Sequence, residues 1–156
     1  MPPAVCLRSA RNDERSSLSA LCLRSKGYWG YDAAFLEACR AELTIRPDDP
    51  ADLIRVAEVD GVVAGVAQLG SSADGDWYVE KLFVDPPFIG RRVGARLMRW
   101  IVETAKARGA KRLVIEADPG AAPFYRRFGA ADAGEAPSGS IPGRLLPRLV
   151  ITLSGT

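Results

Sequence analysis

The sequence predicts an α/β domain in which a meander of strands is followed by alternating helices and strands. Three consecutive runs are rich in β-branched and aromatic residues, as strands are. Apolar residues then recur every three to four positions from about residue 90 to 108, which indicates an amphipathic helix. A chain of 156 residues with 47% apolar content favours one compact domain spanning residues 1–156. The three strand runs are residues 54–59, 62–69 and 77–84.

The N-terminal part is expected to form a short strand and two helices. Residues 5–7 are a short apolar run, and residues 11–14 then supply capping and acidic side chains for a first helix. After Gly27 the aromatic segment 28–31 reads as a turn, and Asp32 is placed to cap a second helix. The two helices therefore flank an aromatic turn.

The central strands are separated by strong turn signals. Asp60-Gly61 joins the first two runs and is a typical two-residue hairpin turn. A polar cluster at residues 71–76 leads into the third run, which ends at Asp85-Pro86-Pro87. We therefore expect three antiparallel strands in succession.

The C-terminal part repeats the order of strand and helix. Gly109 ends the long helix, a short buried strand follows at 112–117, and a short helix at 121–128 is closed by Gly129. A loop rich in Gly, Ser and Pro is expected at 134–147 between two candidate strands, of which 149–153 is the clearer.

Composition excludes several classes of function. With 21 basic and 19 acidic residues, the net charge of +2 is too balanced to indicate a nucleic-acid or membrane-surface partner. No window has the apolar length of a signal peptide or a membrane span, so we expect a cytoplasmic protein. The three cysteines are widely spaced and histidine is absent, which argues against a metal site. Acid–base chemistry near neutral pH must therefore use other side chains.

The segment 82–97 has the layout of an anion-binding site, because a strand, a turn bearing Gly and Arg, and a long helix follow one another. The first turn of a helix has N–H groups without internal partners and a partial positive charge, which together favour phosphate oxygens. Gly90 and Gly94 would let phosphates come close to the backbone. The same Gly-x-x-x-Gly spacing also suits tight packing of a helix against a sheet.

At these residues the chain resembles the GNAT acetyltransferase superfamily, whose acyl-CoA signature is Gln/Arg-x-x-Gly-x-Gly/Ala after a strand ending Val-x-Pro. Val84-Asp85-Pro86 and Gly94 match, whereas Ile89 and Arg92 stand where Gln or Arg and the middle Gly are usual. Arg92 could contact the pyrophosphate through its guanidinium or crowd the turn. The resemblance implies that acetyl-CoA is bound by Ile89, Gly90, Arg91, Arg92, Val93, Gly94 and Ala95.

A second stretch, residues 118–130, resembles the family pattern Asn-x-x-Ala-x-x-Phe/Leu-Tyr-x-x-x-Gly-Phe, with Asp118 at the Asn position and among the expected cofactor contacts. Residues 29–31 and 138–144 also look like those of a bacterial subgroup of the family. The resemblance covers nearly the whole chain. It implies the GNAT fold, a mixed, mostly antiparallel, twisted sheet flanked by helices and splayed between its fourth and fifth strands.

The resemblance implies an N-acetyltransferase that uses acetyl-CoA as co-substrate and no metal. In this family the amine attacks the thioester directly, so one site must hold two substrates, accept a proton and stabilise an oxyanion. We expect a small primary amine as acceptor and a monomer or homodimer without nucleic-acid or membrane partners. The alternative is a regulatory module that binds acyl-CoA without turnover, which the unusual Ile89 and Arg92 would mark.

The same resemblance places the pantetheine arm of the cofactor beside the backbone of Leu82, Phe83 and Val84, since its amides mimic a neighbouring strand. Tyr125 matches the family tyrosine near the coenzyme sulfur, which would both contact the cofactor and protonate the departing thiolate. Tyr125 could also be a buried core aromatic.

Glu80 is a candidate general base. It alternates with Leu82 and Val84, so strand geometry is expected to turn all three to one face, where a carboxylate could accept the amine proton. This function requires a raised pKa. The alternative is a surface salt bridge.

Three further residues are candidates for acceptor binding. Trp29 and Tyr31 occupy the region that shapes the acceptor pocket in the family, and aromatic rings there could contact a cationic amine or simply pack in the core. Arg144 follows a Pro-Gly turn in a late loop that commonly approaches the acceptor, where a guanidinium could bind a carboxylate. The alternative is an exposed loop arginine.

Overall fold

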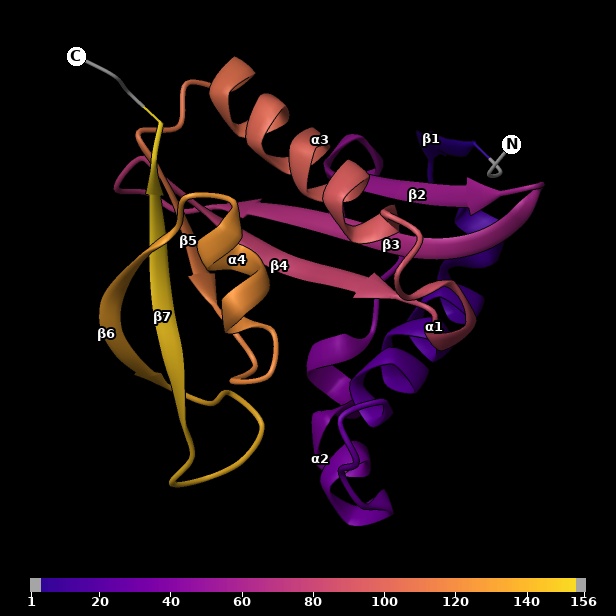
Figure 1. The fold of residues 1–156 in the computed structure, drawn as a ribbon, viewed down its shortest axis with the longest axis horizontal. Coiled ribbons are helices and arrows are strands. Elements are labelled where there is room, and N and C mark those ends of the chain that lie inside the picture. Colours follow the sequence, from indigo (N-terminus) through magenta and orange to yellow (C-terminus); the bar gives the residue numbers. More distant parts are fainter. Residues whose placement is uncertain (1–3, 154–156) are drawn as a thin grey trace.

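The computed structural model describes residues 4–153, which form a seven-stranded mixed sheet flanked by helices (Figure 1). The strand order is β1-β2-β3-β4-β5-β7-β6, and every neighbouring pair is antiparallel except β4 and β5. The strands are β1 (Val5–Ser9), β2 (Ile54–Val59), β3 (Val62–Ser71), β4 (Asp76–Val84), β5 (Arg112–Glu116), β6 (Ala131–Pro137) and β7 (Leu145–Thr152). The α-helices are α1 (Arg15–Gly27), α2 (Ala33–Leu43), α3 (Val93–Ala107) and α4 (Ala122–Arg127). No helix within residues 4–153 is both long and apolar enough to cross a membrane.

The sheet splays between β4 and β5, as the sequence predicts. The two parallel strands pair only where Asp76, Trp77 and Tyr78 face the start of β5, and they diverge beyond Tyr78 (Figure 1). At the closed end the Arg112 guanidinium donates to both carboxylate oxygens of the buried Asp76, over 3.0 and 2.6 Å. The fourth strand therefore leaves the edge of its second half, up to Val84, without a partner strand on that side.

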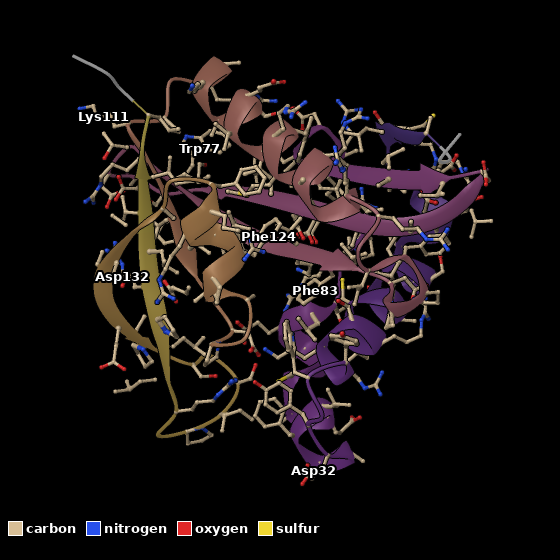
Figure 2. All side chains as sticks on the ribbon, viewed as in Figure 1. Asp32, Trp77, Phe83, Lys111, Phe124 and Asp132 are labelled. Atoms are coloured by element: carbon tan, nitrogen blue, oxygen red, sulfur yellow. The ribbon has the colours of Figure 1, made fainter. Side chains whose placement is uncertain are left out.

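Two hydrophobic cores cover the two faces of the sheet. The larger core lies under α3 and α4, and the smaller one lies under α1 and α2. Phe124 on α4 packs against the first core and Phe83 on β4 against the second; Figure 2 labels both. The apolar stripe predicted for the long helix is confirmed, because its fully buried residues are Val93, Leu97, Met98, Ile101 and Ala105.

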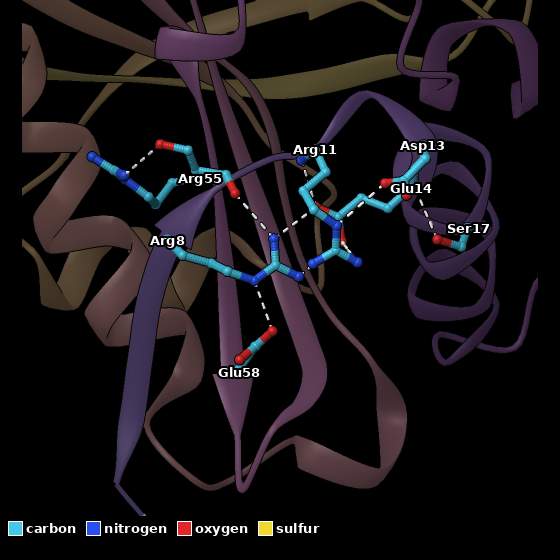
Figure 3. Close-up of polar contacts among 8 residues, drawn as sticks. Arg8, Arg11, Asp13, Glu14, Ser17, Arg55 and Glu58 are labelled. Atoms are coloured by element: carbon cyan, nitrogen blue, oxygen red, sulfur yellow. Dashed lines mark hydrogen bonds and ion pairs between the residues drawn. The ribbon is translucent and has the colours of Figure 1, made fainter.

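An ion-pair cluster fixes β1 to its neighbours (Figure 3). Arg8 on β1 donates from Nε to Glu58 on β2 over 2.7 Å, and from Nη1 and Nη2 to the two oxygens of Glu14 over 2.7 and 2.8 Å. The buried Glu14 also accepts the Arg11 N–H over 2.7 Å. These bonds outweigh the burial of Glu14 and lower the pKa of its carboxyl group. The predicted capping segment 11–14 thus anchors the start of α1.

The sequence-based expectation for the tail is wrong in one respect. Half of the predicted loop 134–147 is strand, since β6 extends to Pro137 and β7 begins at Leu145, which leaves residues 138–144 as the loop. A register shift between Asp132 and Glu135 places Gly134 at an irregularity, with φ of 91°. Glycine at a bulge is compatible with a strand, and pairing between β6 and β7 overrides the weak local propensity.

Candidate functional site

A cavity of about 670 Å³ occupies the opening between β4 and β5. It reaches from the start of α3, along β4, to the loop between β6 and β7. Of the residues that the sequence predicts for the site, all except Arg91 and Tyr31 line this cavity. The predicted residues that line it are Trp29, Glu80, Leu82, Phe83, Val84, Ile89, Gly90, Arg92, Val93, Gly94, Ala95, Asp118, Tyr125 and Arg144.

The turn that leads into α3 presents unpartnered amides to one end of this cavity. Within residues 4–153 no backbone acceptor is found for the N–H groups of Gly90 and residues 92–95. The first N–H of the helix to be bonded is that of Arg96, which donates to the Arg92 carbonyl over 3.1 Å. Convergent free amides at a helix start form a site suited to an anion. Arg91 lies apart from the cavity, with its guanidinium 5.8 Å from the centre of the Phe88 ring.

Arg92 has the backbone conformation that glycine adopts most easily. Its φ of 65° and ψ of 14° are left-handed, and it occupies the N-cap position of α3. The helix therefore begins at Val93 rather than near Gly90, as the sequence suggested, because Gly90 and Arg92 both have positive φ. For a residue with a side chain this conformation costs about 1–2 kcal/mol. The backbone of the turn keeps its shape although an arginine stands where the family has glycine. The backbone at Arg92 therefore does not close the site.

Gly94 is not required by helix packing. A Cβ atom at position 94 would lie 3.4 Å from the Phe124 ring and 3.6 Å from Val84, which are ordinary contacts. By contrast, a Cβ atom at Gly65 on β3 would lie 2.9 Å from Val93. Close approach of α3 to the sheet therefore depends on Gly65, and the absence of a side chain at Gly94 needs another explanation.

Tyr125 is both a core aromatic and a lining residue of the cavity. Its side chain is only 6% exposed, and its ring packs edge-on against that of Phe124. Burial raises the pKa of the phenol above its usual value of about 10. The group is therefore protonated at neutral pH, which is the state that a proton donor must have, although burial also makes it a weaker acid.

Glu80 lies at a β-bulge, so one sequence-based expectation is wrong. Gln68 pairs with Lys81 and Leu69 pairs with Val79, which leaves Glu80 as the extra residue of β4. Strand alternation would give Glu80 the same face as Leu82 and Val84, but those two pack against the core under α3. The Glu80 side chain instead lies over Gly70 and, with Gln68 and Lys81, also lines a second cavity on the α2 side.

The surroundings of Glu80 raise the pKa of its carboxyl group. Partial burial by the cavity walls is the largest cause, and the charges of Glu116, Asp49 and Glu42 add to it. Lys81 opposes these effects, while its own ammonium group is buried and donates to Gln68 Oε1 over 3.0 Å. A raised pKa is the property that a carboxylate base needs in order to work near neutral pH.

Asp118 forms a polar network at the other end of the cavity. Its Oδ2 accepts hydrogen bonds from Lys26 Nζ over 2.8 Å and from Tyr31 Oη over 2.7 Å. Its Oδ1 accepts the N–H of Gly120 over 2.9 Å, and Arg144 Nη2 donates to Tyr31 Oη over 2.7 Å. Burial raises the pKa of Asp118, but these hydrogen bonds outweigh it, so the net shift is downward. The structure thus brings together Tyr31 and Arg144, which the sequence assigns to acceptor binding.

The aromatic turn after α1 contributes Trp29 and Tyr31 in different ways. Trp29 is 46% exposed and packs on Gly120, where a Cβ atom would lie 2.8 Å from the indole ring. Tyr31 stacks on Phe35 with ring centres 4.0 Å apart, and partial burial raises the pKa of its phenol. Sequence reasoning missed Lys26, Glu42 and Glu116, because isolated charged residues carry no signal of where they converge.

The chain is similar to a known protein family and to several solved structures. Residues 20–130 match the model of the acetyltransferase (GNAT) family. A GCN5-related N-acetyltransferase from Rhodopseudomonas palustris is 26% identical with a TM-score of 0.79, over 98% of this chain and 97% of that chain. The PaiA N-acetyltransferase of Thermoplasma acidophilum, solved with coenzyme A, is 14% identical with a TM-score of 0.75, over 96% of this chain and 99% of that chain.

A putative acetyltransferase of Salmonella typhimurium, YncA, solved with its cofactor acetyl-CoA, is 20% identical with a TM-score of 0.68, over 98% of this chain and 96% of that chain. A search of curated protein sequences gives no significant match.

Proposed function

Because this chain belongs to the acetyltransferase (GNAT) family, we propose that it transfers the acetyl group of acetyl-CoA directly to a primary amine of a small acceptor. The observation that carries the proposal is one continuous cavity. At one end it has the unpartnered amides of the turn before α3, and further along it has Glu80 and Tyr125. Two substrates can therefore meet between a phosphate-binding element and acid–base groups.

The residues at the start of α3 fit the pyrophosphate of the cofactor. The free N–H groups of Gly90 and residues 92–95 would donate to its oxygens, with the helix dipole adding to the attraction. The Arg92 guanidinium, exposed beside these amides, would add a charged contact. The PaiA and YncA structures, which share this fold, were solved with coenzyme A and acetyl-CoA, and this supports coenzyme binding in general.

The unpaired edge of β4 would hold the pantetheine arm. Beyond Tyr78 no strand covers the edge at Leu82, Phe83 and Val84, and all three residues line the cavity. Backbone groups on a free strand edge pair well with the amides of an extended ligand. The thioester supplies the activated acetyl group when acetyl-CoA is bound.

Glu80 and Tyr125 would handle the protons of the reaction. The Glu80 carboxylate, whose pKa is raised by burial and by neighbouring carboxylates, would accept a proton from the acceptor's ammonium group. The neutral amine would then attack the thioester carbonyl. The Tyr125 phenol, kept protonated by burial, would donate a proton to the leaving thiolate. Trp29, Tyr31 and Arg144 would form the acceptor side.

The test is an assay of purified protein for thiol release from acetyl-CoA across a panel of amines, with mass spectrometry of the products. We expect an acetylated amine in stoichiometric amount with the released thiol. Binding of coenzyme A without any acetylated product would instead favour a regulatory module without turnover.

A further inference from the structure

We propose that the acceptor carries a carboxylate in addition to its amine, and that Arg144 and Lys26 form the subsite that binds this carboxylate. The inference rests on the proposed function and narrows its acceptor to the chemical class of amino carboxylic acids.

The network contains more positive charge than negative charge. The Asp118 carboxylate lies 2.8 Å from Lys26 Nζ and 3.6 Å from Arg144 Nη2, so one anion serves two cations. The three side chains are only 13%, 19% and 10% exposed for Lys26, Arg144 and Asp118. Shielded cations are costly without a counter-ion, because burial removes part of their hydration. A second anion entering the cavity would balance the excess charge.

The guanidinium of Arg144 is held in place but is not saturated with hydrogen bonds. It lies over the stacked rings of Tyr31 and Phe35, 5.2 and 5.0 Å from their centres. Nη2 donates to Tyr31 Oη, whereas Nε and Nη1 donate no hydrogen bond to any residue among 4–153. A fixed planar fork with free donors suits a carboxylate, and little side-chain entropy remains to be lost on binding.

The same cavity also has the negative charge that the amine requires. Glu80 and Glu116 line the same cavity as Arg144 and Lys26, and their charges act on each other. An ammonium group near these carboxylates and a carboxylate near the cations would match both ends of a zwitterion. A simple amine would leave the excess positive charge around Asp118 unbalanced, and a polyamine would increase that positive charge.

The experiment compares matched acceptors that differ only in the carboxylate, such as phenylalanine with phenethylamine and leucine with isoamylamine. For the unaltered protein we expect kcat/KM to be at least tenfold higher for each amino acid. Arg144→Gln should raise KM for the amino acids about tenfold or more, which corresponds to loss of a charge-assisted hydrogen bond, and should reduce the preference for each amino acid over its decarboxylated amine by a similar factor. Arg144→Lys should raise KM for the amino acids by a smaller factor.

The control is Arg40→Gln, on an exposed arginine of α2 that pairs with Glu37 and does not line the cavity. This variant should leave kcat/KM unchanged for both classes of acceptor. Equal kcat/KM for the members of each pair in the unaltered protein would overturn the proposal. An equal loss for both members in Arg144→Gln would also overturn it, since that result would assign Arg144 a structural role.

Calorimetric titration of phenylalanine and phenethylamine onto the protein saturated with coenzyme A tests the subsite without turnover. Phenylalanine should bind at least tenfold more tightly, and Arg144→Gln should remove the difference. If no amine is acetylated but this preference is present, the proposed function fails while the carboxylate subsite stands. If transfer occurs but the preference is absent, only the subsite fails.

Discussion

The Glu80 side chain occupies the space that a side chain at position 70 would fill. A Cβ atom on Gly70 would lie 2.9 Å from Glu80 Cγ and 3.0 Å from Glu80 Cδ, and still closer to a carboxylate oxygen. The bulge in β4 turns Glu80 toward this strand, so the glycine of β3 and the bulge together define where the carboxylate lies.

We expect Gly70→Ala to displace the Glu80 carboxylate and to lower kcat by about 10- to 100-fold, because a misplacement of about 1 Å is enough for such a loss. The affinity for coenzyme A should not change, since position 70 does not line the main cavity. Steady-state kinetics together with calorimetric binding checks this. An alanine variant with full activity would show that Glu80 has no catalytic part that depends on its position.

Glu80→Gln should lower the rate by about 10²-fold or more, as removal of a general base does. In the unaltered protein the base must be ionised, so activity should fall as pH decreases through the pKa of Glu80. This pKa is raised above its usual value of about 4.3, which moves the acid limb of kcat/KM toward neutral pH. The Gln variant should lack that limb, and an unchanged pH profile would assign the limb to another group.

Tyr125→Phe should lower kcat and leave the affinity for coenzyme A unchanged. The phenol donates no hydrogen bond to a residue within 4–153, so its removal should change the free energy of unfolding by less than about 1 kcal/mol. Pre-steady-state measurement of thiol release, combined with thermal unfolding, separates the chemical effect from a packing defect. Equal rates for both proteins would remove Tyr125 from the mechanism.

Arg92→Gly should weaken coenzyme A binding and reduce its salt dependence, because a guanidinium beside the free amides is lost. The free energy of unfolding should not decrease. Glycine relieves a strain of about 1–2 kcal/mol at φ of 65°, and the stabilisation of the unfolded chain by its added conformational freedom is somewhat smaller. The matched control is Gly90→Ala, which forces a side chain into φ of 89° and should destabilise the fold. Tighter coenzyme binding in Arg92→Gly would indicate that the arginine obstructs the turn.

Gly94→Asp should weaken acetyl-CoA binding strongly, because it places a negative charge beside the amides proposed to hold phosphate. Gly94→Ala is the control, since a methyl group would make only ordinary contacts at 3.4 Å or more. Isothermal titration of both variants gives the comparison. Similar affinities for the two would mean that the phosphates bind elsewhere.

The sequence predicts those features that depend on local pattern. The stripe of α3, the Asp60-Gly61 hairpin and the order of elements follow from periodicity and turn residues. The C-terminal end of β6 and the start of β7 could not be predicted, because Gly134 in β6 and Pro147 in β7 weaken the local strand propensity and the strands form only by pairing with each other. The bulge at Glu80 was hidden for a related reason, since a register shift is a property of two strands and not of one.

The candidate site shows the same division. Motif resemblance selected Gly94, Asp118 and Tyr125, which all line the cavity. It gave no sign that Lys26, Tyr31 and Arg144 surround Asp118. These groups come from segments far apart in the chain, and only the tertiary fold brings them together. Charge balance in the acceptor region therefore could not be read from the sequence.

The bidentate pair between Arg112 and Asp76 has a mechanical consequence for the whole molecule. It sits at the vertex of a wedge whose arms are β4 and β5, so slack of a fraction of an ångström there is multiplied along the arms. The width of the opening, where the two substrates would be brought together, thus depends on two side chains at the far end of the sheet. Neither of them would contact a substrate.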